Sequence, residues 1–273
     1  MFHLFFTAII AMILLNCSRP AADPETIIVA HRGASWYAPE NTIPAFMLAW
    51  DQGADAIEGD FFLTADGEIV CIHDPQTGRV ADRDLVVAES SLEQLRELDV
   101  GSWKDPQFAG TYIPTIAEVF DIVPDGKKFF IEIKVGPEIL PRLYQEIERS
   151  HLSADQIIII SFNSEVIRQV KTDRPMHKAY WLSGFREDED GSLSPGPDMI
   201  LETLQKTGAD GFSSSHRLVT PEIIDRVIDA GYEYHVWTVN DASIAREFQG
   251  YGALSITTDR PGFIRESLET RSP

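Results

Sequence analysis

Residues 26–63 read TIIVAHRGASWYAPENTIPAFMLAWDQGADAIEGDFFL, the pattern of a β-strand, an α-helix and a second β-strand in succession. The apolar runs at 26–31 and 56–63 are typical of buried strands, and the segment between them has helical spacing. Thr42, with Pro44 in the first turn, marks the start of this helix. Two strands joined through a helix run parallel, so this stretch predicts a β/α unit.

The same alternation of strand and helix continues to the end of the chain. Stretches with helical spacing, such as PEILPRLYQEIERS and TPEIIDRVIDAG, lie between the apolar runs. Eight such units predict an α/β fold, the parallel (β/α)8 TIM barrel, at residues 27–268, and the 273 residues suit one barrel of roughly 250. An open doubly wound sheet is the alternative, but the glycine-rich fingerprint of that fold does not follow the first strand. We expect the strands at 26–31, 56–63, 129–134, 157–162, 178–183, 210–215, 234–239 and 255–259.

One segment interrupts this alternation. Between IVCIHD (69–74) and PTIAEVF (114–120), the chain has too many residues for an ordinary loop and contains many turn formers. We therefore expect an insertion after the second strand, at about 75–113, that forms a small subdomain over the strand ends. The sequence REDEDGSLSPGPD (186–198) is predicted to be a solvated acidic loop.

The formal net charge of −20 limits the classes of partner. A nucleic-acid backbone or an anionic membrane surface would be repelled on average, so no nucleic-acid partner is expected. Association with a membrane is expected only through the N-terminal leader or a lipid anchor. An anionic small-molecule substrate would need local positive charge, supplied by a metal, Arg32 or Lys134.

The N-terminus has the composition of a secretory leader. Thirteen of the first 16 residues are apolar, which is shorter than the ~20 that a membrane span requires. Residues 1–17 are therefore predicted to be a signal or lipoprotein leader, followed by a linker at 18–26. Leu14-Leu15-Asn16-Cys17 resembles a bacterial lipoprotein box, which implies an exported, periplasmic or cell-envelope protein anchored by lipid at Cys17. A cleaved signal or an uncleaved anchor is the alternative.

The acidic residues of the second and third strands have the spacing of a metal site. Glu58 and Asp60 are two positions apart and so share one face of a strand, and Glu132 and Lys134 repeat the arrangement. These acids could instead form core ion pairs with Lys134 or Arg32. Three acids outnumber two bases, however, and buried charges need partners. We therefore predict that Glu58, Asp60 and Glu132 bind one divalent cation, Ca²⁺ or Mg²⁺.

Two histidines accompany these acids. His31 ends the first strand and His73 ends the short strand in EIVCIHD, where Asp74 is placed to orient it or to cap the next turn. Paired imidazoles can divide base and acid roles near neutral pH, so both are candidate catalytic residues. The remaining histidines lack such a context. Cys71 is expected to be a buried hydrophobe with no disulfide.

An ordered set of motifs resembles one enzyme family. HRG with PENT, then EGD (58–60), HD (73–74), GSW (101–103), PT (114–115), EIK (132–134), VWTVND (236–241) and TDRP (258–261) resemble the glycerophosphodiester phosphodiesterase family in order and spacing. The resemblance covers about 27–268. It implies the barrel shared with phosphatidylinositol-specific phospholipases C, with the insertion after the second strand.

The resemblance also implies an activity and residue roles. The activity is hydrolysis of glycerophosphodiesters to sn-glycerol 3-phosphate and an alcohol. By position, the metal ligands are Glu58, Asp60 and Glu132, and the acid/base pair is His31 and His73. Arg32 and Lys134 would hold phosphate oxygens and Trp237 would line the glycerol pocket. The serine-rich DGFSSSHRLVT departs from the family pattern at the sixth strand and bears on leaving-group selectivity.

Two other functions remain open at this stage. A lysophospholipase D or sphingomyelinase D type phosphodiesterase would use the same barrel and similar chemistry on a substrate with a long acyl chain. A lipoprotein that binds a phosphorylated ligand without turnover would need no proton carriers, and the two histidines argue against it.

Overall fold

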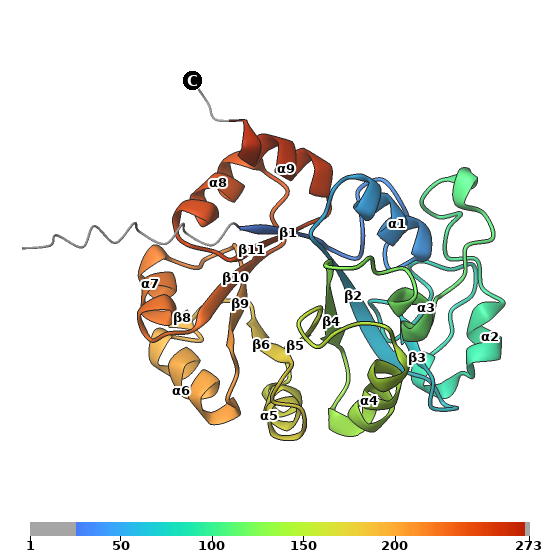
Figure 1. Cartoon of the computed structure of the whole chain (residues 1–273), viewed down its shortest axis with the longest axis horizontal. Helices are drawn as coiled ribbons and strands as arrows, with labels where there is room; N and C mark the ends of the chain where they lie inside the picture. The colour runs from blue at the N-terminus through green and yellow to red at the C-terminus, as the bar shows by residue number, and fades with distance from the viewer. Residues whose placement is uncertain (1–25, 271–273) are drawn as a thin grey trace, which may run out of the picture.

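The eight expected strands close into a parallel barrel in the computed structural model, which describes residues 26–270 (Figure 1). β1 (Ile27–Ala30) pairs with β11 (Ser255–Thr258) on one side and β2 (Ala56–Leu63) on the other, which closes the ring. The fold is the predicted (β/α)8 TIM barrel. The remaining barrel strands are β4 (Lys128–Ile133), β5 (Ile157–Ser161), β6 (Lys178–Ser183), β9 (Gly211–Ser215) and β10 (Glu233–Trp237).

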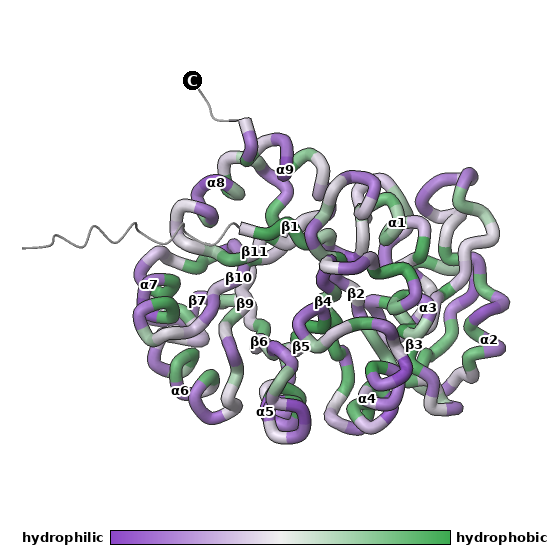
Figure 2. Tube along the Cα trace, viewed as in Figure 1, coloured by the Kyte–Doolittle hydropathy of each residue, from purple (hydrophilic) through white to green (hydrophobic). Residues whose placement is uncertain are grey.

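Helices surround the barrel and turn their apolar sides toward it (Figure 2). Side-chain oxygens of Thr42, Thr220 and Asp241 accept hydrogen bonds from the first turns of their helices, and the bond to Thr42 confirms the helix start predicted there. The helices are α1 (Ile43–Asp51), α3 (Ile116–Phe120), α4 (Leu140–Arg149), α5 (Ser164–Asp173), α6 (Pro197–Thr207), α7 (Pro221–Asp229), α8 (Ala242–Gly250) and α9 (Pro261–Glu269). A short 3-10 turn, η3 (Pro137–Ile139), precedes α4.

The alternation of side chains along each strand divides the barrel into two regions. Val29, Ala56, Phe130, Ile158 and Tyr180 pack together inside the barrel as one cluster. The side chains at the alternate positions of each strand, such as Ile57 and Phe61 of β2, point outward and pack against the helices. The inward positions that follow this apolar layer toward the carboxyl ends of β2 and β4 are acidic, and this end of a TIM barrel is where active sites lie.

The segment after β2 builds a separate layer over one side of the barrel. β3 (Ile69–Cys71) pairs antiparallel with the carboxyl half of β2. The following residues form η1 (Val87–Glu89), α2 (Leu92–Arg96) and η2 (Pro106–Phe108). Their apolar side chains make a second core cluster that includes Phe62, Val70, Val87, Leu95 and Val100. This core fixes the segment against the mouth of the barrel.

The acidic stretch at 186–198 contains a feature that the sequence pattern did not indicate. β7 (Arg186–Glu187) and β8 (Leu193–Ser194) form a two-stranded antiparallel hairpin. At the turn, the Asp188 backbone N–H donates to the Ser192 carbonyl oxygen, and the N–H of Gly191, which has a positive φ of 81°, donates to the Asp188 carbonyl oxygen. Its acidic side chains are exposed, as a solvated segment requires.

The predicted leader at 1–17, its Cys17 and nearly all of the linker lie outside the described residues. Cys71 is buried and its thiol is free. None of the helices within residues 26–270 is both long enough and apolar enough to cross a bilayer.

Candidate active site

Three buried carboxylates meet at the carboxyl end of the barrel. Glu58 and Asp60 come from β2, and Glu132 comes from β4, where it stands opposite Asp60 in the register of the two strands. Their side chains are nearly closed to solvent, with exposures of 2%, 1% and 9%. One oxygen from each residue lies within 4.8 Å of the others, so the three can share one ion. The structure thus brings together the residues predicted as metal ligands.

Two cations lie against this acidic cluster. Lys134 Nζ is 3.1 Å from Asp60 Oδ1 and 2.7 Å from Glu132 Oε1. Arg32 Nε is 3.2 Å from Asp60 Oδ2, and the Arg32 backbone N–H donates to Glu58 Oε2 at 2.9 Å. The second oxygen of Glu58 is buried without a hydrogen-bond partner. An unpartnered carboxylate oxygen beside two other acids is the arrangement that a hard cation satisfies.

The charges in this cluster act differently on the three acids. Burial, reinforced by the charges of Asp60 and Glu132, raises the pKa of Glu58 well above its usual value. Burial and the charge of Asp60 likewise raise the pKa of Glu132. Burial also opposes ionisation of Asp60, but Arg32 and Lys134 outweigh it and hold the pKa of Asp60 below its usual value. The protein alone therefore leaves the cluster short of positive charge, and a divalent cation fits this deficit.

The loop after β1 gives Arg32 its place in this cluster. Arg32 adopts a left-handed conformation with φ of 54°, and Gly33 follows with φ of 80°. A Cβ atom on Gly33 would lie 2.5 Å from the backbone carbon of Ala45. The HRG sequence therefore contains glycine because the loop packs directly against α1 with a backbone that side chains rarely adopt.

Asn41 also holds Asp60 in place. Its Nδ2 donates to Asp60 Oδ2 at 2.8 Å, and its Oδ1 accepts from the Asp60 backbone N–H at 3.1 Å. The Cys71 thiol lies 3.3 Å from the same Asn41 oxygen. Asn41 belongs to the PENT motif, but the sequence pattern did not indicate this role.

Each candidate histidine is paired with an aspartate through Nδ1. His31 Nδ1 lies 2.6 Å from Asp259 Oδ1, and His73 Nδ1 lies 2.6 Å from Asp74 Oδ1. Burial opposes ionisation of Asp259, yet the hydrogen bond and charge of His31 lower the pKa of Asp259 to about 2. An ionised aspartate accepts the Nδ1 proton, which leaves Nε2 of each ring to exchange a proton. Burial lowers the pKa of His73.

Asp259 was not singled out from the sequence, although it lies in the quoted motif TDRP. It follows β11 and so reaches the same end of the barrel as His31. Ser35 Oγ also donates to Asp259 Oδ1 at 2.9 Å, and Asn240 Nδ2 donates to Oδ2 at 2.6 Å. Together with His31, Ser35 and Asn240 hold the Asp259 carboxylate in place beside the His31 ring.

Arg79, another residue that the sequence pattern did not indicate, connects the two sides of the site. Its Nε lies 2.5 Å from Asp74 Oδ2, and its two terminal nitrogens donate to Glu40 at 2.7 and 3.0 Å. Glu40 also accepts from Arg32 Nη1 at 3.0 Å. A chain of contacts thus runs from His73 through the inserted segment to Arg32.

The space in front of the acids is a small pocket, here called the inner pocket. Its walls contain both histidines, Arg32 and Lys134, together with Trp237 and Phe162, and its volume is about 120 Å³. The rings of Trp237 and Phe162 meet edge to face with centroids 5.6 Å apart. Ser213, from the serine-rich strand β9, also lines this pocket. All the predicted site residues within the described range therefore gather at one mouth.

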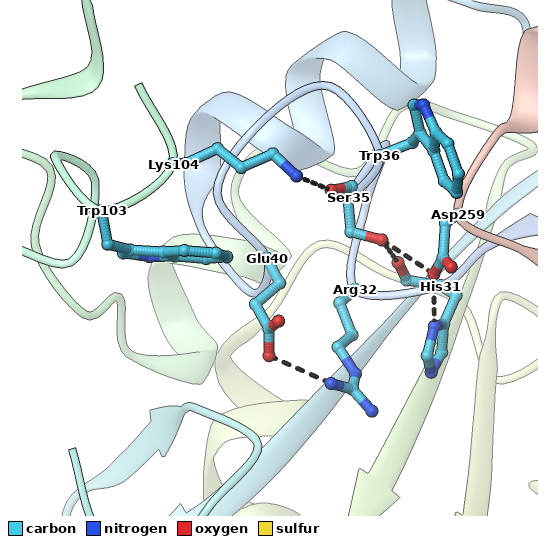
Figure 3. Close-up of a pocket in the computed structure, with 8 residues that line it drawn as sticks. All are labelled: His31, Arg32, Ser35, Trp36, Glu40, Trp103, Lys104 and Asp259. Carbon is cyan, nitrogen blue, oxygen red and sulfur yellow. Dashed lines mark hydrogen bonds and ion pairs between the residues drawn. The ribbon is translucent and has the colours of Figure 1, made fainter. Parts of the chain in front are cut away.

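A larger hollow of about 420 Å³ adjoins it and is here called the outer pocket (Figure 3). His31 and Arg32 line both pockets. The other residues of the outer pocket come from the loop after β1, the inserted segment and the end of β11, and are Ser35, Trp36, Glu40, Trp103, Lys104 and Asp259.

The histidines set aside from the sequence do not line either pocket. His235 is buried inside the barrel against Tyr180, with ring centroids 4.0 Å apart, and burial lowers its pKa to about 4. His177 is also buried, and His151 lies 3.1 Å from the Val123 carbonyl oxygen. His216 lines neither pocket, and His3 lies outside the described residues.

Comparison with known proteins identifies one family. The model of the glycerophosphoryl diester phosphodiesterase family matches residues 31–263. A glycerophosphodiester phosphodiesterase from Caldanaerobacter subterraneus subsp. tengcongensis is 33% identical over 244 residues, 87% of this chain and 95% of that protein. A solved glycerophosphodiester phosphodiesterase from Agrobacterium tumefaciens is 26% identical, with a TM-score of 0.72 over 89% of this chain and all of that one.

A second solved structure supports the fold. It is a phosphodiesterase from Oleispira antarctica in complex with its product sn-glycerol-3-phosphate, and it has a TM-score of 0.81 at 24% identity. The match covers 89% of this chain and 97% of that one.

Proposed function

This chain belongs to the glycerophosphoryl diester phosphodiesterase family, whose members are phosphoric diester hydrolases, and from that premise we propose its substrate and mechanism. The substrate is a glycerophosphodiester, and the products are sn-glycerol 3-phosphate and an alcohol. The observation that carries the proposal is the meeting of Glu58, Asp60 and Glu132 with two aspartate-paired histidines at one barrel mouth.

Glu58, Asp60 and Glu132 would hold one divalent cation, Ca²⁺ or Mg²⁺. Oxygen-only ligands suit both ions, and the unpartnered oxygen of Glu58 is satisfied by either. When bound, such an ion neutralises phosphoryl charge and polarises the phosphorus for attack.

Arg32 and Lys134 would bind the phosphate oxygens of the substrate. Both line the inner pocket beside the acids, and both already lie within ion-pair distance of Asp60. A guanidinium can hold two oxygens at once, whereas the ammonium acts as a point charge. These cations give the acidic protein a local positive site for an anionic substrate. Trp237 and Phe162 would pack against the carbon atoms of the glycerol unit.

His31 would act as the base and His73 as the acid. His31 Nε2 takes the proton from the attacking oxygen as the new P–O bond forms. His73 Nε2 donates a proton to the alcohol oxygen as the old P–O bond breaks. Attack by a water gives sn-glycerol 3-phosphate directly, whereas attack by the substrate's own glycerol hydroxyl gives a cyclic phosphate. A water then opens this ring, losing its proton to His73 while His31 returns a proton to the glycerol oxygen. Asp259 and Asp74 hold the two rings through Nδ1, so both Nε2 atoms remain available to the substrate.

The first experiment measures sn-glycerol 3-phosphate released from a panel of glycerophosphodiesters with Ca²⁺, Mg²⁺ or a chelator. Release that needs a cation supports the proposal. Release of choline from lysophosphatidylcholine instead would favour the lysophospholipase D type of activity. Chelator-insensitive ligand binding without product would favour a non-catalytic binding protein.

A second experiment assigns the histidines. Replacement of either His31 or His73 by Ala should lower kcat by about 10² or more, the usual contribution of a general acid or base. A diester with a 4-nitrophenol leaving group needs little protonation, so it should restore activity to His73→Ala far more than to His31→Ala. The reverse pattern would exchange the two roles, and near-full activity in both variants would contradict the mechanism.

We further propose that residues 1–17 direct export to the periplasm or cell envelope and that Cys17 becomes lipidated. The apolar run and the Leu-Leu-Asn-Cys sequence support this. Detergent-phase partition of the full chain, lost in Cys17→Ala, tests it, and partition that persists in this variant would contradict lipidation at Cys17.

A further inference from the structure

We propose that the outer pocket is the subsite for the leaving alcohol, and that it selects uncharged, hydroxyl-rich ring alcohols over alcohols that carry an ammonium group. This inference rests on the hydrolase function proposed above and names the substrate class within it. It follows from where the pocket lies, from the two indole rings in its walls and from the balance of charge around them.

The position of the pocket fits the second arm of a phosphodiester. The inner and outer pockets share His31 and Arg32. A phosphate held at Arg32, with its glycerol arm toward Trp237, has its other ester arm free to enter the outer pocket. At about 420 Å³, this hollow is within the usual size range of small-molecule sites and can accept a six-membered ring.

Two tryptophans give the pocket flat apolar walls. Trp36 lies in the loop after β1 and Trp103 in the inserted segment, and their exposures of 52% and 44% are high for indoles. Figure 3 shows them at opposite sides of the hollow, with Ser35, Arg32 and Glu40 between them. The Trp103 ring N–H donates to the Val100 carbonyl oxygen at 2.9 Å, so this ring is held in place. A fixed, exposed indole is suited to contact with the C–H face of a ring alcohol.

The acidic groups of the pocket already have hydrogen-bond partners. Glu40 accepts three hydrogen bonds from Arg32 and Arg79. Asp259 accepts from His31, Ser35 and Asn240. A cationic alcohol entering the pocket would therefore meet no unpaired carboxylate among its lining residues.

Two positive groups at the pocket, by contrast, have no acidic partner. They are Lys104, which lines it, and Arg260, which lies against the lining residue Trp36. Within residues 26–270, neither lies within ion-pair distance of a carboxylate. The two cations also lie over the indoles that would otherwise attract an ammonium group. Lys104 Nζ is 5.6 Å from the Trp103 ring, and the Arg260 guanidinium is 4.9 Å from the Trp36 ring. A second cation would be repelled here.

Lys104 can also donate to a ligand. Its Nζ makes one hydrogen bond, to the Ser35 carbonyl oxygen at 2.7 Å, and an ammonium group has three N–H donors. Hydroxyl oxygens of the alcohol can accept the remaining donors. The pocket therefore offers stacking and donors to a polyol, and repulsion to choline or ethanolamine.

The experiment compares kcat/KM for glycerophosphoinositol and glycerophosphocholine, each followed by release of sn-glycerol 3-phosphate. We expect the wild-type protein to prefer the inositol diester by about tenfold or more, the range that one well-matched contact provides. Trp103→Ala and Lys104→Met should each lower this ratio several-fold, and Lys104→Met should also raise kcat/KM for the choline diester because it removes a repelling charge.

Two control variants match these changes outside the pocket. Lys128 Nζ donates to the Asp155 carbonyl oxygen at 2.8 Å, a contact like that of Lys104, and Lys128→Met should leave the ratio unchanged. Tyr112 is an exposed aromatic residue of the same inserted segment, and Tyr112→Ala should also leave it unchanged. Thermal melting of each variant reports whether the fold is intact.

The outcomes separate this inference from the proposed function. Turnover with equal kcat/KM for the two diesters, or a ratio that the Trp103 and Lys104 variants leave unchanged, overturns the assignment of the outer pocket and leaves the hydrolase intact. If no glycerophosphodiester is hydrolysed, the proposed function fails and this inference fails with it.

Discussion

His31 and Asp259 are 228 positions apart in the sequence, and their side chains are joined by a contact of 2.6 Å at the mouth of the barrel. The two residues follow β1 and β11, which are adjacent because the barrel closes between them. Closure of the barrel therefore also builds the histidine–aspartate pair. Any role of His31 as a proton carrier depends on this pairing, since the aspartate orients the ring.

Replacement of Asp259 by Asn should lower kcat by about 10² or more, with little change in KM, because Asp259 holds the base rather than the phosphate. The measurement is steady-state release of sn-glycerol 3-phosphate beside a thermal melt. Asp210→Asn is the matched control, because Asp210 is ion-paired with Lys171 at the opposite end of the barrel. This control should lower stability without a comparable loss of kcat. Wild-type kcat in Asp259→Asn would contradict the role of the pair.

The sequence predicted the acids and the histidines of the site, and the reason is local. Glu58 and Asp60 share a face because strand side chains alternate, and the strand itself is evident from its apolar residues. His31 directly follows such a run. Positions at the ends of parallel strands converge in a barrel, so the pattern alone places these groups together.

Asp259, Asn41 and Arg79 could not be predicted in the same way. Each acts through a contact between segments whose relative placement depends on closure of the barrel or on the packing of the insertion. An arginine in an irregular insertion has no periodicity that points to the site. The β7–β8 hairpin was missed for a similar reason, since each strand has only two residues.

Replacement of Glu58 by Gln should stabilise the protein in the presence of a chelator. Burial and neighbouring acids raise the pKa of Glu58 in the folded state above that of the unfolded chain. Ionisation of Glu58 therefore lowers the free energy of unfolding. This loss is absent below the pKa of the unfolded chain, near 4.3, and it grows as the pH rises toward the pKa of the folded state. At pH 7 the variant should melt at least about 2 °C higher, and the difference should vanish near pH 4.

Glu58→Gln should also lose the rise in melting temperature that Ca²⁺ or Mg²⁺ gives the wild type, because a neutral amide is a poorer ligand for a divalent cation. Glu146→Gln is a matched control, since Glu146 is also buried but is paired with Arg142 and Arg149 on α4. This control should not gain stability and should keep the cation response. A Glu58→Gln protein that melts lower in chelator and still responds to the cation would refute the metal-site assignment.

Arg79 is expected to act as a positioning residue. It holds Asp74 and Glu40, which in turn contact His73 and Arg32. Arg79→Met should lower kcat/KM by roughly tenfold, because the lost hydrogen bonds release both partners. Arg79→Lys should recover part of this loss, since it keeps the charge but not the fork of donors.

The control for Arg79 lies in the same inserted segment. Arg83 is an exposed arginine paired with Glu97 at 3.1 Å, away from both pockets. Arg83→Met should change neither kcat/KM nor the melting temperature appreciably, since exposed ion pairs contribute little stability. Equal effects of Arg79→Met and Arg83→Met on kcat/KM would show that Arg79 does not position the catalytic groups.

The packing of the HRG loop can be tested with a pair of glycines that share one backbone conformation. Gly33 and Gly67 have φ of 80° and 81°, but a Cβ at Gly33 would lie 2.5 Å from the Ala45 backbone, whereas none of the described atoms lies within 4 Å of a Cβ at Gly67. Gly67→Ala should cost only the ~1–2 kcal/mol of a left-handed alanine. Gly33→Ala adds a backbone clash that the loop can relieve only by moving Arg32 and His31, so we expect a larger fall in denaturant midpoint together with loss of activity. Equal midpoints for the two variants would show that the loop does not depend on its close approach to α1.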